Sequence, residues 1–225
     1  MKKNIVIFGA SSSISQNIID LYKRDKANIY AFSRSKLKVN GINSFQTNYN
    51  EKSLQKIKTL LKDIKIDIVF FANGFLSNEV EDVDKIFLIN SILPIKFTEM
   101  ILSCNQQKCK FVFFNSPSAE RGRKSTFLYG AAKKSIDIFC QGMRHKYSQI
   151  NKDIEFYNII IHPTQTKMTN HLSNKDIFAD PNYVAKKIIK VLSTKKYHSY
   201  LSIKWILIML IIKKIPNFIF NKLNI

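Results

Sequence analysis

The sequence predicts an α/β protein with one doubly wound parallel sheet and helices on both faces. Short apolar runs rich in β-branched and aromatic residues alternate with longer stretches of helical spacing. No Gly/Ser linker or internal repeat interrupts that alternation. The 225 residues, 45% of them hydrophobic and 23% charged, match one ordinary globular domain. We expect this domain over residues 1–203, followed by an apolar, Lys-flanked tail over residues 204–225.

The expected strands read as continuous apolar runs, the pattern of strands buried on both faces. They cover residues 4–8, 28–33, 66–72, 110–115 and 154–162, with a weaker strand at 197–201. Each of the first five is followed by a stretch of helical spacing, and the expected helices cover residues 14–24, 51–62, 80–104, 127–148 and 180–193. Asp180 as a cap and Pro181 in a first turn are good start signals. Right-handed crossovers then place ligands beyond the carboxyl ends of the strands.

Composition narrows the function classes. Cys104, Cys109 and Cys140 are odd in number and form no C-x-x-C pair, so we expect no disulfide framework, no metal site and a reduced, cytoplasmic compartment. The start of the chain lacks the pattern of a signal peptide. A net charge of +20 raises affinity for any polyanion, but it also fits a general bias towards Lys, Asn and Ile. Without an aromatic-interleaved basic motif, we expect no specific nucleic-acid partner.

A run of small residues, GASSSIS, follows the first strand and opens a helix. Backbone N–H groups at such a turn approach a pyrophosphate closely, so its members are candidate phosphate contacts. These candidates are Gly9, Ser11, Ser12, Ser13 and Ile14. Because only one glycine is present, a purely structural turn with a serine cap is the alternative interpretation.

The ends of the next two strands suggest a cofactor. Ser33 and Arg34 follow the second strand, where an acid would bind the ribose 2′-OH of NAD and a cation favours the 2′-phosphate of NADP. We therefore expect NADP(H) to be preferred over NAD(H), with a merely solvated Arg34 as the alternative. After the third strand, Ala72, Asn73 and Gly74 form a sharp turn where a dinucleotide would pass.

Ser116 follows a strongly apolar strand, and Tyr129 and Lys133 come thirteen and seventeen residues later. The i, i+4 spacing places the phenol and the ammonium on one helical face. A tyrosine titrates near 10 in isolation, so a neighbouring positive charge would be needed to stabilise its phenolate. Alone, Y-x-x-x-K is also the pattern of a surface pair or of an aromatic residue in the core.

In order along residues 3–193, GASSSIS, the tripeptide ANG, Asn90, Ser116 and YGAAK resemble the short-chain dehydrogenase/reductase family. The resemblance implies a Rossmann-like sheet with strand order 3-2-1-4-5-6-7. It also implies that Tyr129 is the general acid or base and that Ser116 holds and polarises the same substrate oxygen. Lys133 would depress the tyrosine pKa and bind the nicotinamide ribose, and Asn90 would hold a water that links Lys133 to solvent.

The full cofactor-binding set includes further positions. It comprises Gly9, Ser11, Ser12, Ser13, Ile14, Ser33, Arg34, Asn48, Ala72, Asn73, Gly74, Tyr129, Lys133, Pro163 and Thr166. The chain departs from the family pattern where Ser13 and Ser15 replace the second and third motif glycines. The usual Pro-Gly after the sixth strand reads Pro163-Thr164, and the segment TKMT arrives about two residues early. The resemblance also implies a homodimer or homotetramer through the helices at 80–104 and 127–148.

The stretch 127–144, the segment TKMT and the ending IKWILIMLIIKKIPNFIFNKL are similar to reductases of polyprenyl-phosphoryl keto-pentoses and their relatives in cell-surface polysaccharide synthesis. This predicts NADPH-dependent reduction of a keto group, or oxidation of the alcohol, on a sugar or lipid-linked sugar. Two alternatives stay open. One is a soluble reductase of a 3-oxoacyl thioester or a small ketone, and the other is a catalytically idle protein that binds NADP or a polyanion.

The tail carries an unbroken apolar run over residues 205–212, flanked by Lys204 and by Lys213-Lys214. A bilayer-spanning helix needs about 20 apolar residues, so this run is too short to span. It fits a helix lying on anionic lipid, on the inner face of the cytoplasmic membrane, or a segment packed against the protein's own pocket or a sister subunit. The short region between 163 and 181 predicts a small lid and an open pocket.

Overall fold

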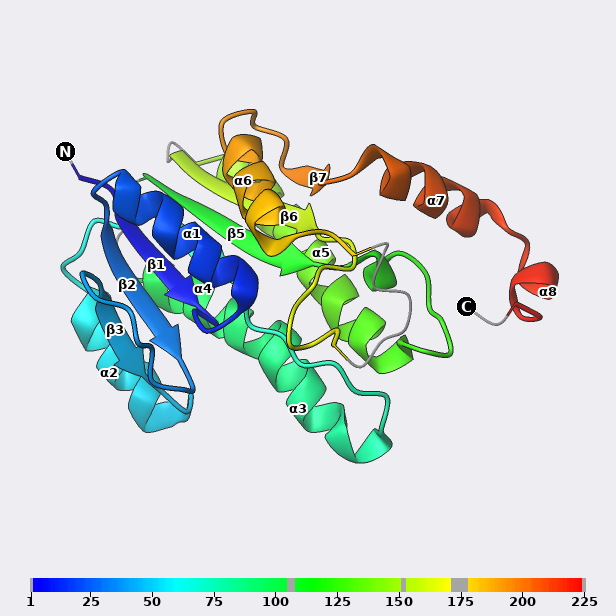
Figure 1. Cartoon of the computed structure of the whole chain (residues 1–225), viewed down its shortest axis with the longest axis horizontal. Coiled ribbons are helices and arrows are strands. Elements are labelled where there is room, and N and C mark those ends of the chain that lie inside the picture. The colour runs from blue at the N-terminus through cyan, green and yellow to red at the C-terminus, as the bar shows by residue number, and fades with distance from the viewer. Residues whose placement is uncertain (1, 105–107, 151–152, 171–177, 224–225) are drawn as a thin grey trace.

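The computed structural model describes residues 2–104, 108–150, 153–170 and 178–223. Within them, seven parallel strands form one sheet in the order β3-β2-β1-β4-β5-β6-β7, which confirms the expected order (Figure 1). The strands are β1 (Asn4–Phe8), β2 (Asn28–Ser33), β3 (Asn43–Gln46), β4 (Ile68–Phe71), β5 (Lys108–Asn115), β6 (Asp153–Ile160) and β7 (His198–Tyr200). Since all neighbouring pairs are parallel, the carboxyl ends meet at one edge of the sheet.

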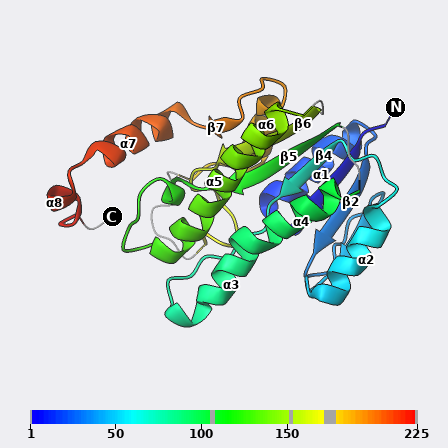
Figure 2. The same ribbon diagram turned by 180° about the vertical axis from the view of Figure 1, so that it is seen from behind.

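Helices cover both faces of this sheet (Figures 1 and 2). The helices are α1 (Ser13–Arg24), α2 (Glu51–Leu61), α3 (Val83–Phe87), α4 (Leu93–Leu102), α5 (Phe127–Ser148), α6 (Pro181–Val191), α7 (Ile203–Lys214) and α8 (Asn217–Phe220). Helices α1 and α6 lie on one face, and α2, α4 and α5 lie on the other. Three shorter segments are η1 (Val80–Asp82), η2 (Leu88–Ile92) and η3 (Pro117–Ala119).

Alternate residues of each central strand pack into the two layers, as the period of a β-strand requires. In β1, Ile5 and Ile7 face α1 and α6, whereas Val6 and Phe8 face the layer of α4 and α5. The second layer is rich in stacked aromatic rings. The ring centroid of Phe8 lies 5.1, 5.5 and 4.0 Å from those of Phe32, Phe71 and Phe97. These contacts fix the ends of β1, β2 and β4 relative to one another.

The sequence pattern misses β3. Its residues, NSFQ, are mostly exposed and form no apolar run, because an edge strand next to solvent needs few buried side chains. Strand β3 is held in the sheet by its pairing with β2. The register of this pairing sets Phe45 beside Phe32.

The helix expected over residues 80–104 is divided into η1, α3, η2 and α4. Segment η2 is a π-helical turn that carries Asn90. It continues directly into α4, because Leu93 at their junction has right-handed helical backbone angles. Pro94, in the first turn of α4, has no N–H to donate to the Asn90 carbonyl four residues earlier. The missing α-helical bond explains why the helix widens here, and such widened turns are frequent at functional sites.

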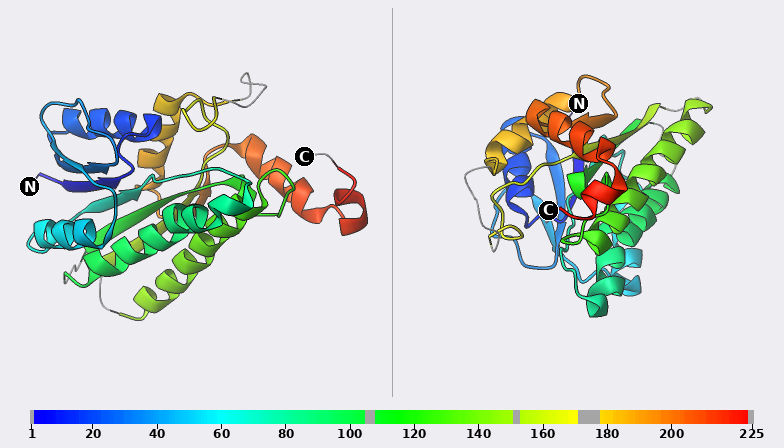
Figure 3. Two further views of the ribbon diagram at one scale, coloured as in Figure 1. Left: turned by 90° about the horizontal axis from the view of Figure 1, so that it is seen from below. Right: turned by 90° about the vertical axis from the view of Figure 1, so that its right-hand side faces the viewer.

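The tail forms α7 and α8, which project beyond the carboxyl end of the sheet (Figures 1 and 3). Arg121 anchors it. One guanidinium nitrogen donates to the main-chain oxygen of Ile215 at 2.6 Å and also to that of Ile212, and the other donates to Asn217 at 2.9 Å. Among the residues that the structure describes, no helix has the length and apolar character needed to cross a membrane.

Candidate active site

The carboxyl edge of the sheet brings together residues that are far apart in the sequence. Gly9 follows β1, Arg34 follows β2, Asn73 comes just after β4, Ser116 follows β5 and Pro163 comes shortly after β6. In a doubly wound sheet, ligands bind outside this edge. The five turns that the sequence predicts as ligand contacts therefore lie along one edge of the sheet.

The turn after β1 needs its glycine. Gly9 has φ +77°, and a Cβ there would lie 2.6 Å from the main chain of both Ala72 and Asn73. Ser15, in the place of a motif glycine, is fully buried, and its hydroxyl donates to the Gly9 carbonyl at 3.1 Å. Ser12 caps α1 by accepting from the Ser15 N–H at 3.1 Å. Hydrogen bonds thus accommodate the serines that depart from the family pattern.

The positive end of α1 faces the same surface. In the described part of the chain, the N–H groups of Ser13 and Ile14 have no hydrogen-bond partner. Ser11 is exposed beside them. Free N–H groups at a helix N-terminus fit a phosphate group, so the turn suits a dinucleotide pyrophosphate.

The side chain of Tyr49 contacts this turn, although no local sequence pattern predicts a role for Tyr49. Its hydroxyl lies 3.4 Å from the N–H of Gly9 and 3.2 Å from the carbonyl of Phe32, to which it donates. Asn73 lies close enough to this hydroxyl to lower its pKa against the effect of burial. Burial raises the pKa of Tyr49, so the hydroxyl stays protonated and structural.

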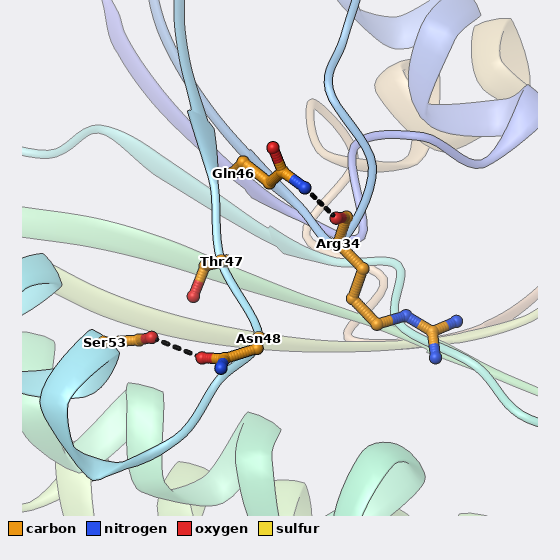
Figure 4. Close-up of a pocket in the computed structure, with 5 residues that line it drawn as sticks. All are labelled: Arg34, Gln46, Thr47, Asn48 and Ser53. Atoms are coloured by element: carbon orange, nitrogen blue, oxygen red, sulfur yellow. Dashed lines mark hydrogen bonds between the residues drawn. The ribbon is translucent and has the colours of Figure 1, made fainter.

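A pocket of about 440 Å³ opens beside the ends of β2 and β3 (Figure 4). Its lining residues are Arg34, Gln46, Thr47, Asn48 and Ser53, none of which is acidic. The Gln46 side chain donates to the Arg34 carbonyl at 3.0 Å, and Ser53 donates to Asn48 at 2.7 Å. The guanidinium of Arg34 is free to extend along the surface. Ser33 is buried instead, and its hydroxyl donates within the turn to the carbonyl of Ser35.

The loops after β4 and β6 touch each other. A Cβ on Gly74 would lie 2.7 Å from the Met168 methyl group, so the second loop crosses directly over the first. The buried Oδ1 atom of Asn73 has no partner within the described residues, which fits a donor group on a ligand. Thr166 is held in the second loop by Thr169, whose hydroxyl lies 3.1 Å from its N–H. Part of the expected lid, residues 171–177, lies outside the described residues.

Ser116, Tyr129 and Lys133 come together where α5 packs on β5. The Ser116 hydroxyl lies close enough to that of Tyr129 to lower the pKa of the phenol. The Lys133 ammonium is buried, donates to the Phe114 carbonyl at 2.8 Å and lies 5.7 Å from the centroid of the Tyr129 ring. Asn115 donates to the carbonyl of Lys133 at 3.1 Å. Helix α5 is therefore tied to the end of β5 at two points.

The titration of this pair departs from the expectation that Lys133 depresses the tyrosine pKa. Removal from water raises the pKa of Tyr129 to about 12, and the hydrogen bond from Ser116 offsets only part of this effect. Burial lowers the pKa of Lys133 to about 8. In the chain by itself burial is the stronger influence on both groups. At neutral pH the phenol keeps its proton and most of the lysine is charged.

A buried polar network lies beneath these residues. Asn158 accepts from Asn115 at 2.8 Å and donates to Asp137 at 2.8 Å, and His198 lies 3.4 Å from the same carboxylate. Asn115 in turn accepts from the N–H of Ser116 at 2.8 Å. The members come from β5, α5, β6 and β7, so no spacing in the sequence predicts the network. Satisfied buried amides of this kind fix side-chain positions.

Asn90 ties two elements together. Its side-chain amide donates to the carbonyls of Phe75 at 2.7 Å and Ile86 at 2.9 Å, and its side-chain oxygen accepts from the N–H of Phe75 at 3.2 Å. Both amide hydrogens are thus used by the main chain. If Asn90 holds the water implied by the resemblance, its main-chain carbonyl, which Pro94 cannot satisfy, is the better acceptor.

A doubly wound sheet with this phosphate turn and a tyrosine–lysine pair at its carboxyl edge defines a class, the oxidoreductases that use a nicotinamide dinucleotide. The family model for short chain dehydrogenase matches residues 3–177, and the chain belongs to that family. It is an NAD(P)-dependent oxidoreductase of the short-chain type.

Solved structures show the same fold at low sequence identity. A short chain dehydrogenase from Burkholderia cenocepacia J2315 in complex with NADP has a TM-score of 0.82 at 12% identity, covering 93% of this chain and 94% of that one. A short-chain dehydrogenase from Sphingobium yanoikuyae in complex with NADPH has a TM-score of 0.80 at 13% identity, with coverages of 92% and 91%. The 4-hydroxyisoleucine dehydrogenase complexed with NADH has a TM-score of 0.75 at 17% identity, with coverages of 88% and 97%.

The lowered pKa of Lys133 predicts a pH dependence of stability. In the unfolded chain this lysine holds its proton up to about pH 10.5, whereas the folded chain releases it near pH 8. The unfolded state therefore binds more protons between these values, and stability rises with pH. Relative to Lys133→Met, the unfolding free energy of the wild type should increase by up to about 1.4 kcal/mol per pH unit in this window.

Urea unfolding followed by circular dichroism at several pH values measures the difference. Lys146→Met removes an exposed lysine from the other end of α5 and is the matched control. Its unfolding free energy should change with pH as that of the wild type does. If the unfolding free energy of Lys133→Met also changed with pH as that of the wild type does, the claim that burial lowers the pKa of Lys133 would be contradicted.

Proposed function

We propose that the protein reduces a keto group, or oxidises the corresponding alcohol, on a sugar or lipid-linked sugar in cell-surface polysaccharide synthesis, with NADP(H) as its cofactor. The observation that carries the chemistry is the placement of the buried Lys133 ammonium, which donates to the Phe114 carbonyl at 2.8 Å and lies 5.7 Å from the centroid of the Tyr129 ring. Ser116 lies near the same phenol and lowers its pKa. A half-buried, protonated phenol beside a second hydroxyl is suited to receive a carbonyl oxygen.

The side chains divide the work of reduction. The bound cofactor supplies the hydride. Ser116 donates a hydrogen bond to the carbonyl oxygen and orients it, and Tyr129, whose pKa of about 12 keeps it protonated, delivers the proton to that oxygen. Below about pH 8 the charged Lys133 stabilises the phenolate that remains. Asn90 fixes the loop after β4 through Phe75, and its main-chain carbonyl would hold the water that returns a proton.

The lining of the pocket beside β2 supports the preference for NADP(H). Arg34 offers a cation, and the other lining residues offer only neutral polar groups. A carboxylate at this position would repel a 2′-phosphate, and the pocket has none. The backbone of Gly9, Ser11, Ser12, Ser13 and Ile14 would hold the pyrophosphate. Ala72, Asn73, Gly74, Pro163 and Thr166, which follow β4 and β6, would line the path from there to the reacting groups.

Arg123 supports a substrate that carries a phosphate. It lies in the segment between Ser116 and Tyr129, where one guanidinium nitrogen donates to Ser118 at 2.8 Å. Its Nε atom is buried and has no partner within the described residues, and no carboxylate there lies within ion-pair distance. Burial lowers its pKa. A half-buried guanidinium without a counter-charge suits the phosphate of a sugar phosphate or of a lipid-linked sugar.

The outer surfaces of the long helices support assembly into a homodimer or homotetramer. Leu88 and Ile92 on η2, and Phe127 and Ile138 on α5, are each more than two-fifths exposed. Apolar side chains gathered on neighbouring helices are typical of an interface.

The Arg34 pocket gives a prediction for cofactor choice. Arg34→Ala should weaken NADPH binding by about tenfold, because a charge-assisted hydrogen bond to the 2′-phosphate is lost. NADH binding should change little, since NADH has no such phosphate. Titrations followed by nicotinamide fluorescence measure both affinities, with Lys36→Ala as the control for a nearby exposed charge. An equal loss for the two cofactors would remove Arg34 from cofactor selection.

The role of Tyr129 gives a prediction for turnover. Tyr129→Phe should lower kcat by at least about a hundredfold with NADPH binding unchanged, because it removes only the hydroxyl that delivers the proton. The substrates are phosphorylated keto-sugars, the same sugars without phosphate, a 3-oxoacyl thioester and a small ketone, assayed by the loss of NADPH absorbance.

We expect turnover of the phosphorylated sugars, with Arg123→Gln raising KM for these and not for the unphosphorylated ones. Full activity in Tyr129→Phe would refute the assigned acid. Preference for the thioester or the small ketone would replace the proposed substrate with the soluble alternative.

A further inference from the structure

Helix α7 exposes aliphatic side chains where a helix at the surface of a globular protein carries polar ones. Its inner side is occupied by Trp205, Met209 and Ile212, with Met209 only 2% exposed. Its outer face consists of Ile203, Ile206, Leu207, Leu210 and Ile211, which are 76, 36, 57, 51 and 65% exposed. On α8, which follows α7 in the tail, Phe218 is also 71% exposed. Exposed apolar side chains gathered on one helix in this way indicate an interaction site.

The part of the chain that forms this face contributes charge of one sign. From residue 181 to the end of the chain the sequence contains nine lysines and no Asp or Glu. Lys204 and Lys214 flank the apolar face of α7, Lys222 follows α8, and all three are exposed. An apolar helix face bordered by lysines matches the boundary between anionic lipid headgroups and acyl chains.

The apolar face is held in a fixed direction. Arg121 binds the carbonyls at the end of α7, and its guanidinium lies 3.7 Å from the centroid of the Phe220 ring in α8. Glu120 accepts from Lys213 at 2.6 Å. At the other end of α7, Trp205 stacks on His162, with ring centroids 6.4 Å apart. These contacts are made to Glu120, Arg121 and His162, which all lie near the carboxyl edge of the sheet, so the tail projects from the same end as the candidate active site (Figure 3).

We propose that the outer face of α7, together with α8, docks on an anionic lipid bilayer, with α7 lying in the headgroup region. Helix α7 has 12 residues and is about 18 Å long, which suits a helix that lies on a membrane and does not cross it. A second copy of the chain is a poorer occupant of this face. Pairing two such faces would bring the lysines of two chains of net charge +20 together, whereas anionic headgroups neutralise them.

Vesicle sedimentation with the full chain tests the proposal. We expect binding to vesicles of mixed phosphatidylcholine and phosphatidylglycerol that is at least about tenfold tighter than binding to phosphatidylcholine alone, and weaker in high salt. Leu207→Ser with Ile211→Ser should weaken it about tenfold, because less apolar area enters the bilayer. Lys214→Gln with Lys222→Gln should weaken binding to the anionic vesicles only. Val80→Ser, a substitution of an aliphatic side chain 70% exposed on η1, is the control and should bind as the wild type does.

Three results would overturn the proposal. The wild type could stay in the supernatant with anionic vesicles, or the double serine variant could bind as tightly as the wild type. Alternatively, gel filtration could show an oligomer that the double serine variant breaks while neither chain binds vesicles, which would make this face an interface between copies. Tyr129→Phe should bind vesicles normally, so failure of the proposed chemistry and failure of docking are distinguishable.

Discussion

The candidate active site depends on one buried cation, the ammonium of Lys133. It donates to the main chain of β5 at Phe114, and the backbone of the same residue accepts from Asn115. These two bonds hold the first turns of α5 against the end of β5. Ser116 and Tyr129 face each other because they lie on either side of this junction. Burying an ammonium costs free energy, and the lowering of the Lys133 pKa to about 8 is the direct expression of that cost.

The segment between Ser116 and Tyr129 connects the site to the tail. It packs tightly on α5, because a Cβ at Gly130 would lie 2.5 Å from the Ser118 carbonyl. The two arginines of this segment, Arg121 and Arg123, make different contacts. Arg121 holds α7 and α8 through both terminal nitrogens of its guanidinium, whereas Arg123 keeps a buried donor without a partner in the described chain. The same loop thus carries the anchor of the apolar tail and, in Arg123, a guanidinium with one unpartnered nitrogen among the described residues.

Much of the fold and site follows from the sequence, because buried parallel strands leave continuous apolar runs and the turns after them carry the polar residues. The six strands expected from such runs are present, and the phosphate turn and the tyrosine–lysine pair lie at one edge of the sheet. Strand β3 leaves no such run, since pairing at an edge needs no apolar side chains. The π-helical turn at Asn90 and the network through Asn158 depend on contacts between distant elements, which a local pattern does not record.

The pH dependence of kcat/KM for carbonyl reduction tests the central claim most directly, since it reports the ionisations of the free protein. If a buried, charged Lys133 stabilises the phenolate left by Tyr129, kcat/KM should be level below about pH 8 and should fall above it as the ammonium loses its proton. In Lys133→Met this fall should be absent and the rate low throughout. A wild-type profile that stays level to about pH 10 would contradict the account.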